Sequence, residues 1–402
     1  MPAFYKEWGY RALLTLKKGI VMAPQPRPAI YVGAGASLDL CKAIGHFGLK
    51  NVLIVTDKPL VELGLLNDAI ARLNSLGVAT HIYDGVLPDP TVHVVSTGLE
   101  MLHKQNCDAV LAIGGGSSID TAKIIALAGA NKLSVLECVG LKKGKVPALP
   151  LFAIPTTAGT GSEVTIVAVV SDDETHQKLM VADPKIIPSA AALDPALMTG
   201  LPPHITAATG MDALTHAIES YINTWDSEDC LQYGRAATKL ILGNLEQACS
   251  NGDDLAARES MAVASYYAGL AFTNCLVGYV HAVSHQLGAL YSVPHGLGNA
   301  MVLPHVLELL RDSAASRLAE LARYCDLGQP GEADIELAQK LIDRIWQLNS
   351  AIGIPKTTDV IKEADIPDIV SAALKEASGY PVPRFLERGE CEDLVHGLRS
   401  AA

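Results

Sequence analysis

The sequence predicts an α/β domain followed by an all-helical domain, and three observations indicate this division. In the first half, short apolar runs rich in β-branched residues alternate with stretches of helical periodicity, which is typical of a mostly parallel sheet covered by helices. After residue 198 the chain is rich in Ala and Leu at helical spacing and nearly loses the β-branched runs. No low-complexity linker separates the halves. We therefore expect an α/β nucleotide-binding domain over residues 1–198 and an all-helical domain over residues 199–402.

Several segments of the first half have the composition of strands. They are residues 29–32, 51–56, 79–84, 109–114, 149–155 and 165–171. Between the second and third of them, residues 60–77 carry apolar side chains at helical spacing. Residues 1–28 precede the first strand and are expected to form an amphipathic extension. This alternation predicts parallel strands, whose carboxyl ends meet at one edge of the sheet.

Composition excludes several classes of function. The 402 residues carry a formal net charge of −12 with both signs spread evenly, so no basic face is expected for nucleic acid. The most apolar run, residues 146–155, is short and interrupted by prolines, whereas a membrane span needs about 20 apolar residues. The 8 cysteines form no CxxC pair, which argues against a zinc ribbon or a disulfide framework and favours the cytoplasm.

Two loops that follow predicted strands are candidates for binding a dinucleotide. GGGSSIDTAK (114–123) offers glycines for close backbone approach, and Ser117 with Asp120 predicts a capping box for the next helix, whose N-terminus would hold pyrophosphate. PTTAGTGSE (155–163) offers threonine hydroxyls. A third loop, GAGASL (33–38), lacks the last glycine of GxGxxG and is interpreted as a tight turn. Asp57 ends a strand, where a carboxylate can bind an adenosine ribose and favour NAD over NADP.

Histidines and one carboxylate recur at helical spacing in the second half. Asp212 and His216 are four residues apart, as are His281 and His285, so each pair shares one helix face, and His295 follows shortly after. Buried core histidines are the alternative, but the joint pattern favours a divalent metal site, and spacing alone leaves open which of the five residues bind. A metalloprotease is excluded because no HExxH motif is present. A metal near a dinucleotide suggests hydride transfer assisted by a Lewis acid.

Taken together, four motifs resemble those of the iron-containing (group III) alcohol dehydrogenases, a family that includes lactaldehyde reductase and 1,3-propanediol dehydrogenase. They are GGGSSIDTAK, PTTAGTGSEVT, GMDALTHAIESYI and HAVSHQLGALYSVPHGLGNAMVLPH. The resemblance runs from about residue 30 to the C-terminus. It implies a dehydroquinate synthase-like fold, with a Rossmann-like dinucleotide-binding domain and an all-α metal-binding domain. It also implies NAD(H), Fe²⁺ (or Zn²⁺ or another divalent ion), a small alcohol or aldehyde substrate and a cytoplasmic homo-oligomer, expected to be a dimer.

The same resemblance implies roles for individual residues. The metal ligands would be Asp212, His216, His281 and His295. His285 would be a catalytic residue that relays a proton, and Phe272 would form an aromatic wall of the substrate pocket. The cofactor would contact Asp57, Gly115, Gly116, Ser117, Thr156, Thr157, Thr160 and Lys178.

The chain departs from the family pattern in three places. The N-terminal extension is expected to serve packing or subunit contact, whereas the apolar Val167 and the loop SGYPVPR at residues 378–384 argue against a diol or lactaldehyde substrate. Three other functions are considered. A hydroxyacid–oxoacid transhydrogenase would keep NAD bound through its cycle. A non-redox lyase of the dehydroquinate synthase type would need cations for a phosphorylated acid, yet residues 204–224 and 270–303 contain no Lys or Arg. A binding protein with core histidines would hold no metal.

Overall fold

The computed structural model describes residues 3–175 and 177–400, which fall into two compact units. Gln25–Leu201 and Asp253–Tyr266 form the sheet unit, and the other described residues form the helical unit. The N-terminal helix therefore groups with the helical unit, although it precedes the first strand. Assigning the cofactor to residues 1–198 and the metal to residues 199–402 remains a prediction.

The main sheet has six strands in the order β1-β9-β6-β4-β2-β3, and all of its pairings are parallel. Its strands are β1 Ala29–Val32, β2 Asn51–Val55, β3 Ala79–Tyr83, β4 Ala109–Gly114, β6 Leu151–Pro155 and β9 Ala190–Leu193. From β3 the chain crosses back to β4 on the other side of β2. Such a change of direction leaves a crevice at the carboxyl ends of the strands, where open α/β sheets bind ligands.

The segment 165–171, which we expected in the parallel sheet, lies in a smaller sheet instead. β7 (Val167–Ser171) pairs antiparallel with β8 (Lys178–Ala182), which also pairs with β5 (Gly140–Leu141). The main sheet contains β9, with the sequence AAAL, in place of the segment 165–171. Composition missed β9 because alanines have no β propensity, and its pairing with both β1 and β6 makes it a strand.

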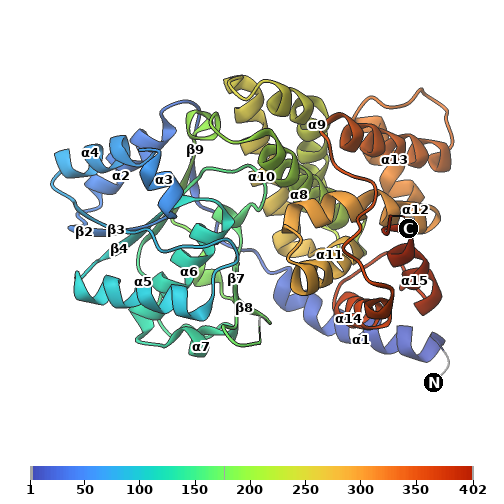
Figure 1. Ribbon diagram of the computed structural model, residues 1–402, viewed down its shortest axis with the longest axis horizontal. Coiled ribbons are helices and arrows are strands. Elements are labelled where there is room, and N and C mark those ends of the chain that lie inside the picture. Colours follow the sequence, from blue (N-terminus) through green and yellow to red (C-terminus); the bar gives the residue numbers. More distant parts are fainter. Residues whose placement is uncertain (1–2, 176, 401–402) are drawn as a thin grey trace. The chain divides into compact units, whose positions relative to one another are not determined.

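Helices cover both faces of the main sheet (Figure 1). α5 (Val92–Lys104) and α6 (Gly116–Asn131) share one hydrophobic core with one face of the strands, and α2 (Ala36–His46) and α4 (Asn67–Ser75) share a second core with the other face. The short helices are α3 (Lys58–Glu62) and α7 (Val135–Cys138). The expected helix over residues 60–77 is broken at Gly64, whose φ is 71°.

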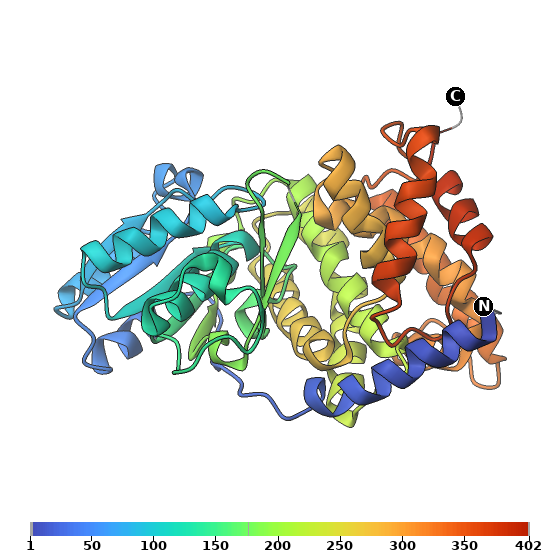
Figure 2. The same cartoon turned by 90° about the horizontal axis from the view of Figure 1, so that it is seen from below.

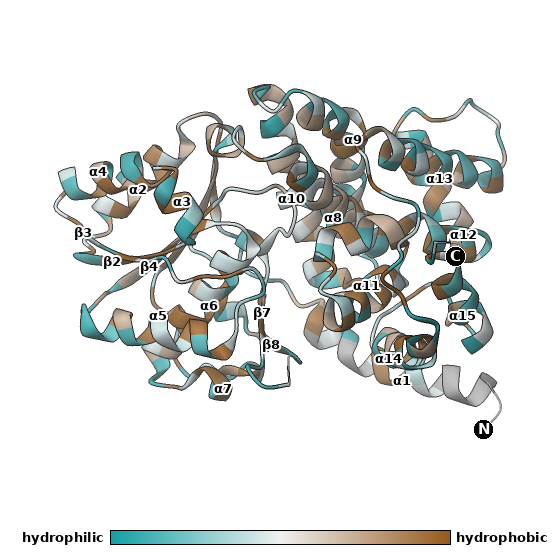
Figure 3. Ribbon diagram, in the orientation of Figure 1, coloured by the Kyte–Doolittle hydropathy of each residue, from teal (hydrophilic) through white to brown (hydrophobic). Residues whose placement is uncertain are grey.

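The helical unit is built around α8 (Pro203–Ile222), which packs against α9 (Glu228–Ser250) and α12 (His295–Tyr324). α12 also packs against α13 (Asp334–Ala351) and α11 (Tyr279–Tyr291), and α11 packs against α14 (Ile366–Ala377). α5 and α13 mix hydrophilic with hydrophobic residues (Figure 3), as expected of helices with one face in water. The remaining helices are α15 (Arg388–Gly397), in this unit, and α10 (Leu255–Cys275), whose residues up to Tyr266 belong to the sheet unit.

No single helix of the described chain is both long and apolar enough to cross a bilayer. α10 and α11 pass that test only when taken together, and the chain bends by 102° between them.

The N-terminal extension forms helix α1 (Ala3–Val21), which lies beside the loop that follows α14 (Figure 2). The Tyr10 and Phe385 rings lie 5.4 Å apart, and the Arg11 guanidinium donates a hydrogen bond to the carbonyl oxygen of Pro383 at 3.2 Å. The extension is therefore attached to the same segment in which this chain departs from the family pattern.

Candidate functional site

Three helices of the helical unit bring the four predicted metal ligands together. Asp212 and His216 lie one turn apart on α8, His281 lies in the first turn of α11, and His295 is the first residue of α12. One ligand atom from each lies within 4.8 Å of all the others. The Asp212 carboxylate is 4.0 Å from His216 Nε2, 3.9 Å from His281 Nε2 and 3.3 Å from His295 Nε2.

This donor set fits a divalent transition metal. Atoms about 2.1 Å from a common ion at tetrahedral angles are about 3.4 Å apart, close to the separations in the cluster. Three imidazoles and a carboxylate suit Fe, Zn, Ni or Co. Asp212, His216 and His281 are buried, whereas the His295 side chain is 43% exposed. A ligand could therefore approach from the His295 side.

Burial and neighbouring charges oppose each other in setting the pKa of Asp212, whereas burial and the neighbouring histidines act together on the pKa of His281. Burial raises the pKa of Asp212, but the histidines around it have the larger combined effect and hold that pKa far below its usual range. Burial and the neighbouring His216 and His295 push the pKa of His281 well below its ordinary value. A neutral imidazole beside an ionised carboxylate is the protonation state that metal binding needs.

Asn299 closes the cluster from the second turn of α12. Its amide Nδ2 donates a hydrogen bond to the Asp212 carboxylate at 2.7 Å and lies 3.1 Å from Nε2 of both His281 and His295. Because the carboxylate can only accept, the amide nitrogen, rather than the oxygen, points at the imidazoles. Nε2 of His281 is therefore an acceptor with its lone pair turned into the cluster.

Glu219, on the next turn of α8, binds the opposite side of the His281 ring. Its carboxylate lies 2.7 Å from His281 Nδ1 and accepts hydrogen bonds from the backbone N–H groups of Gly278 and Val280 at 2.8 and 2.7 Å. Burial raises the pKa of Glu219 to about 8, against these hydrogen bonds, which lower it.

His285 lies beside the ligand cluster and contacts α14. Its Nδ1 lies 2.7 Å from Glu376 Oε1, which also accepts a hydrogen bond from the Tyr380 hydroxyl at 2.8 Å, while Gln286 donates to Oε2 at 3.1 Å. The His285 ring stacks on His295 with a centroid separation of 5.3 Å. The ring thus sits next to the cluster with Nδ1 engaged, which leaves Nε2 to exchange a proton.

Phe272, near the end of α10, stacks on His216. Their ring centroids are 4.2 Å apart and the planes differ by 18°. The predicted aromatic wall is therefore in direct contact with a predicted ligand.

In the sheet unit, the two predicted cofactor loops lie side by side at the carboxyl edge of the sheet. Their strands, β4 and β6, are paired, and the Thr156 N–H donates to the Gly114 carbonyl oxygen at 3.0 Å. A Cβ added to Gly115 would lie 3.3 Å from Thr157 Oγ1, and one added to Gly116 would lie 2.6 Å from Thr160 Cγ2. Only glycine fits at residue 116 without displacing Thr160.

The predicted capping box at the start of α6 is wrong. α6 begins at Gly116 after an N-cap glycine, without a side-chain cap, and Ser117 is already inside the helix. Asp120 instead accepts hydrogen bonds from the Ser162 hydroxyl at 2.5 Å and the Val169 N–H at 2.9 Å. The N–H groups of the first turn are thus left uncapped by side chains, and the Asp120 carboxylate ties α6 to the loop 155–163.

Asp57 and Lys178 have protein partners. Asp57 caps α3 by accepting from the Leu60 N–H at 3.0 Å. Lys178, at the start of β8, forms an ion pair with Asp89, in the loop that follows β3. Neither contact tests the predicted contacts with a cofactor.

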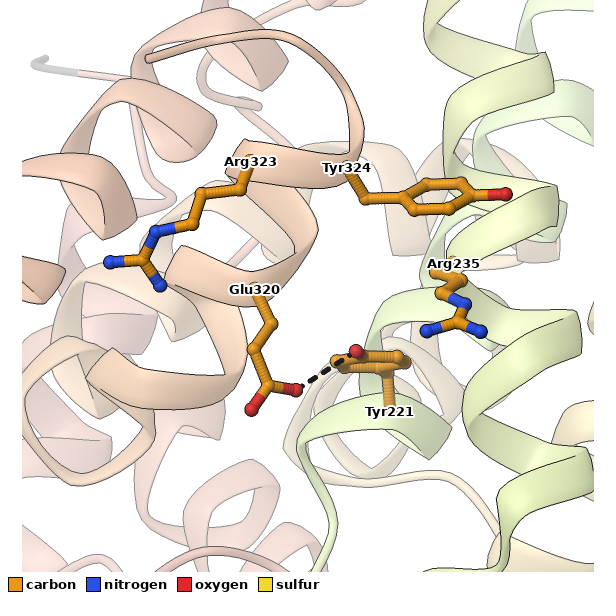
Figure 4. Close-up of a pocket in the computed structure, with 5 residues that line it drawn as sticks. All are labelled: Tyr221, Arg235, Glu320, Arg323 and Tyr324. Atoms are coloured by element: carbon orange, nitrogen blue, oxygen red, sulfur yellow. Dashed lines mark hydrogen bonds between the residues drawn. The ribbon is translucent and has the colours of Figure 1, made fainter. Parts of the chain in front are cut away.

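A cavity of about 400 Å³ in the helical unit contains none of the predicted residues (Figure 4). It is lined by Tyr221, Arg235, Glu320, Arg323 and Tyr324. Tyr221 donates to Glu320 at 3.0 Å and Arg323 pairs with Asp334, so these polar groups already have protein partners.

Sequence reasoning missed Glu219, Asn299 and Glu376. Two of them carried a signal: Glu219 lies seven residues after Asp212 and Asn299 four after His295, so each shares a helix face with a predicted ligand. Glu376 carried none, because it lies 91 residues from His285 in the sequence.

Two family models match almost the whole chain: "Iron-containing alcohol dehydrogenase" over residues 26–195 and "Fe-containing alcohol dehydrogenase family, C-terminal" over residues 206–398. Alcohol dehydrogenase 4 of Schizosaccharomyces pombe is 41% identical and lactaldehyde reductase of Escherichia coli 38% identical. These alignments cover 87% and 91% of this chain and 83% and 96% of the relatives.

Solved structures agree with these matches. A 1,3-propanediol oxidoreductase superimposes with a TM-score of 0.90 at 36% identity, over 93% of this chain and 99% of the other. Sulfoacetaldehyde reductase from Bifidobacterium kashiwanohense, solved in complex with NAD⁺, superimposes with a TM-score of 0.85 at 30% identity, over 94% and 99% of the two chains.

Proposed function

Because this chain belongs to the iron-containing alcohol dehydrogenase family, we propose that it transfers a hydride between NAD(H) and a small primary alcohol or aldehyde, at a metal held by Asp212, His216, His281 and His295. The chain is an oxidoreductase of this family, and its relatives include alcohol dehydrogenases and an aldehyde reductase. Fe²⁺ is the proposed ion, and Zn²⁺ or another divalent ion also suits the donors.

The observation that carries the proposal is the convergence of four ligand atoms from three helices. An ion bound there supplies Lewis-acid polarisation of the alcohol or aldehyde oxygen. The chain's own contribution is to hold His281 in place through Glu219, and to leave the His295 side accessible. Phe272 on His216 excludes water from one wall of the site.

We propose that His285 moves the proton that accompanies hydride transfer. Glu376 accepts from its Nδ1, and Tyr380 and Gln286 hold the Glu376 carboxylate in place. Nε2 of His285 would take a proton from an alcohol during oxidation and return it to the oxygen during reduction.

We propose that the cofactor lies along the carboxyl edge of the sheet. The first turn of α6 would supply the N–H groups of Gly116 and Ser117 to the pyrophosphate, and Gly115 would allow close approach. Thr156, Thr157 and Thr160 would offer hydroxyls to the phosphates and the nicotinamide side. Asp57 would bind the adenosine ribose and Lys178 the nicotinamide ribose, the latter after leaving Asp89.

The test is NADH oxidation with a short aliphatic aldehyde, measured before chelation, after it, and after adding back Fe²⁺ or Zn²⁺ anaerobically. We expect turnover that disappears with the metal and returns with it. An enzyme equally active after complete metal removal would overturn the proposed metal role, and metal-loaded protein that binds no NADH would overturn the cofactor role.

Two related activities are less well supported. A lyase of the dehydroquinate synthase type requires cations for a phosphorylated acid, yet the segments that carry the cluster contain no Lys or Arg. A hydroxyacid–oxoacid transhydrogenase would exchange two substrates without added NADH, so an exchange assay with no free cofactor separates it from the proposed dehydrogenase.

We further propose a cytoplasmic homodimer. None of the 8 cysteines, all within the described residues, is in a disulfide, which fits a reducing compartment. Light scattering on the purified protein measures the oligomeric state, and a mass of twice 42.4 kDa is expected.

A further inference from the structure

We propose that Glu219 is a positioning residue that sets the metal affinity, by holding His281 in the tautomer with the proton on Nδ1 and the lone pair on Nε2. This inference rests on the proposed function, because it takes the cluster of Asp212, His216, His281 and His295 to be a metal site. Glu219 does not belong to that set of ligands. Its oxygens contact the side of His281 that faces away from the other three.

The first step is the position of Glu219 on α8. Asp212, His216, Glu219 and Asn223 recur along one face of this helix, so the first two face the cluster while the last two reach the connection between α10 and α11. The Asn223 side chain donates to the carbonyl oxygens of Cys275 and Val277 at 2.9 and 3.0 Å. α8 therefore supplies two ligands and also fixes the connection that leads into α11, the helix that carries the third ligand, His281.

The second step is the start of α11. Its N-cap residue is Gly278, which has no side chain to satisfy the N–H groups of the first turn. Glu219 takes this role from another helix, with Oε2 accepting from Gly278 and Oε1 from Val280. A carboxylate is favourable at a helix N-terminus, and it fixes the first turn that carries His281.

The third step is the tautomer of His281. Oε2 of Glu219 already receives one N–H and lies 2.7 Å from Nδ1. Burial opposes the ionised carboxylate, but both backbone N–H bonds and a cation bound at Nε2 favour it, and once ionised it requires Nδ1 to be the donor. Independently, the Asn299 amide nitrogen, which donates to Asp212, also faces Nε2 at 3.1 Å, so a proton on Nε2 would point at a second donor. Both contacts select the same tautomer, and it is the one in which Nε2 can bind a metal.

Glu219→Gln is the most specific substitution, because it keeps the shape of the side chain and replaces one acceptor oxygen by a donor N–H₂ group. With the amide nitrogen at the Oε2 position, it would face the Gly278 N–H and force Nδ1 of His281 to accept, which moves the ring proton to Nε2. With the amide nitrogen at the Oε1 position, it would face the Val280 N–H, so two buried donors would point at each other. Either arrangement disturbs His281, and partners of this kind typically change metal affinity about 10- to 100-fold.

The experiment measures the Zn²⁺ dissociation constant by competition with a chromophoric chelator, and the Co²⁺ absorption spectrum, on the full chain. We expect Glu219→Gln to weaken Zn²⁺ binding by about 10- to 100-fold and to alter the Co²⁺ bands. The control is Glu320→Gln, which also removes a carboxylate that accepts from an α8 side chain, Tyr221, but lies outside the cluster. This control is expected to stay within about twofold of the wild type.

A second variant covers the case in which Glu219→Gln fails to fold. Gly278→Ala keeps the carboxylate, but its Cβ would lie 2.8 Å from Glu219 Oε1 and displace it, so Zn²⁺ binding is expected to weaken in the same direction. In addition, ¹⁵N NMR of histidine-labelled wild-type protein reads the tautomer directly, with the proton expected on Nδ1 of His281.

The inference is overturned if Glu219→Gln binds Zn²⁺ as tightly as the Glu320→Gln control, or if the His281 proton is found on Nε2. Failure of the proposed function looks different. A wild-type protein that binds no divalent metal would refute the metal site itself, while the tautomer of His281 would still report whether Glu219 holds the ring.

Discussion

Substituting Gly116 by Ala tests whether the packing of the two cofactor loops controls NADH binding. The new Cβ would lie 2.6 Å from Thr160 Cγ2 and 2.9 Å from Thr160 Oγ1, so the loop 155–163 must move. Gly116 starts a helix and its φ is not left-handed, so the cost is steric. Overpacking of this kind costs about 1–3 kcal/mol of folding free energy.

The loop that must move is the one proposed to face the phosphates. Thr160 cannot turn away freely, because its Oγ1 accepts from the Ser162 N–H at 3.2 Å and Ser162 in turn binds Asp120. If about 1.4 kcal/mol of the strain falls on the bound state, NADH affinity drops about tenfold. Urea unfolding measures the first effect, and quenching or enhancement of NADH fluorescence measures the second.

Two further variants make this test specific. In Gly115→Ala the Cβ would be 3.3 Å from Thr157 Oγ1, so a smaller loss is expected in both assays. Adding Thr160→Ser to Gly116→Ala removes the methyl at 2.6 Å and should recover part of both losses. The reasoning is refuted if Gly116→Ala matches the wild type in stability and NADH affinity, or if Thr160→Ser recovers neither.

The metal cluster, the His285–Glu376 pair and the buried Glu163 give one further prediction each. Zn²⁺ at 100 times its dissociation constant should raise the free energy of unfolding of the wild type, measured by urea titration, by about 2.7 kcal/mol. A similar gain in His281→Ala at the same Zn²⁺ concentration would contradict the ligand assignment. Glu376→Gln should lower kcat and leave the KM for NADH nearly unchanged, because Glu376 accepts from His285 Nδ1. The loss of kcat should be smaller than that for His285→Ala, which is expected to be about 10²–10⁴-fold. An unchanged kcat in steady-state kinetics would show that Glu376 takes no part in the proton transfer. Burial raises the pKa of Glu163 from 4.5 to about 7, so between these pH values the native state keeps a proton that the unfolded chain loses. The free energy of unfolding should therefore fall by about 3 kcal/mol as the pH rises through this window. Glu163→Gln should flatten this pH dependence in urea titrations, and an unchanged slope would show that Glu163 ionises normally.

Local periodicity predicted much of the fold. Five of the expected strands, residues 29–32, 51–56, 79–84, 109–114 and 149–155, lie in the parallel sheet within two residues of the expected bounds. The central ones, β2, β4 and β6, are nearly continuous buried apolar runs, which composition reveals. β9 could not be predicted in this way, since AAAL becomes a strand only through its neighbours on both sides. The same holds for β7, whose β-branched run does not reveal which sheet it joins.

Spacing was informative about the candidate site wherever its residues share a helix. The intervals between Asp212 and His216 and between His281 and His285 placed each pair on one face. Spacing could not separate His281 from His285, because that depends on Glu219 and Glu376, which contact them from distant segments. Such contacts are tertiary, and no local pattern encodes them.

The N-terminal extension shows the same limit. Its amphipathic character was visible in the sequence, whereas its attachment to Pro383 and Phe385 was not. Pro383 lies within the loop 378–384 and Phe385 directly follows it, so the N-terminal extension and the loop, two segments where a departure from the family pattern was expected, are in physical contact.

The fate of a deuterium label tests the central claim of hydride transfer most directly. Metal-loaded protein is mixed with a short aliphatic aldehyde and NADH in which both hydrogens at C4 of the nicotinamide are deuterium, and the alcohol is analysed by mass spectrometry. The account predicts one deuterium on the carbinol carbon with the wild type, and none when the metal has been removed. Alcohol that forms without the label, or no alcohol with any divalent metal and any short aldehyde despite bound NADH, would contradict it.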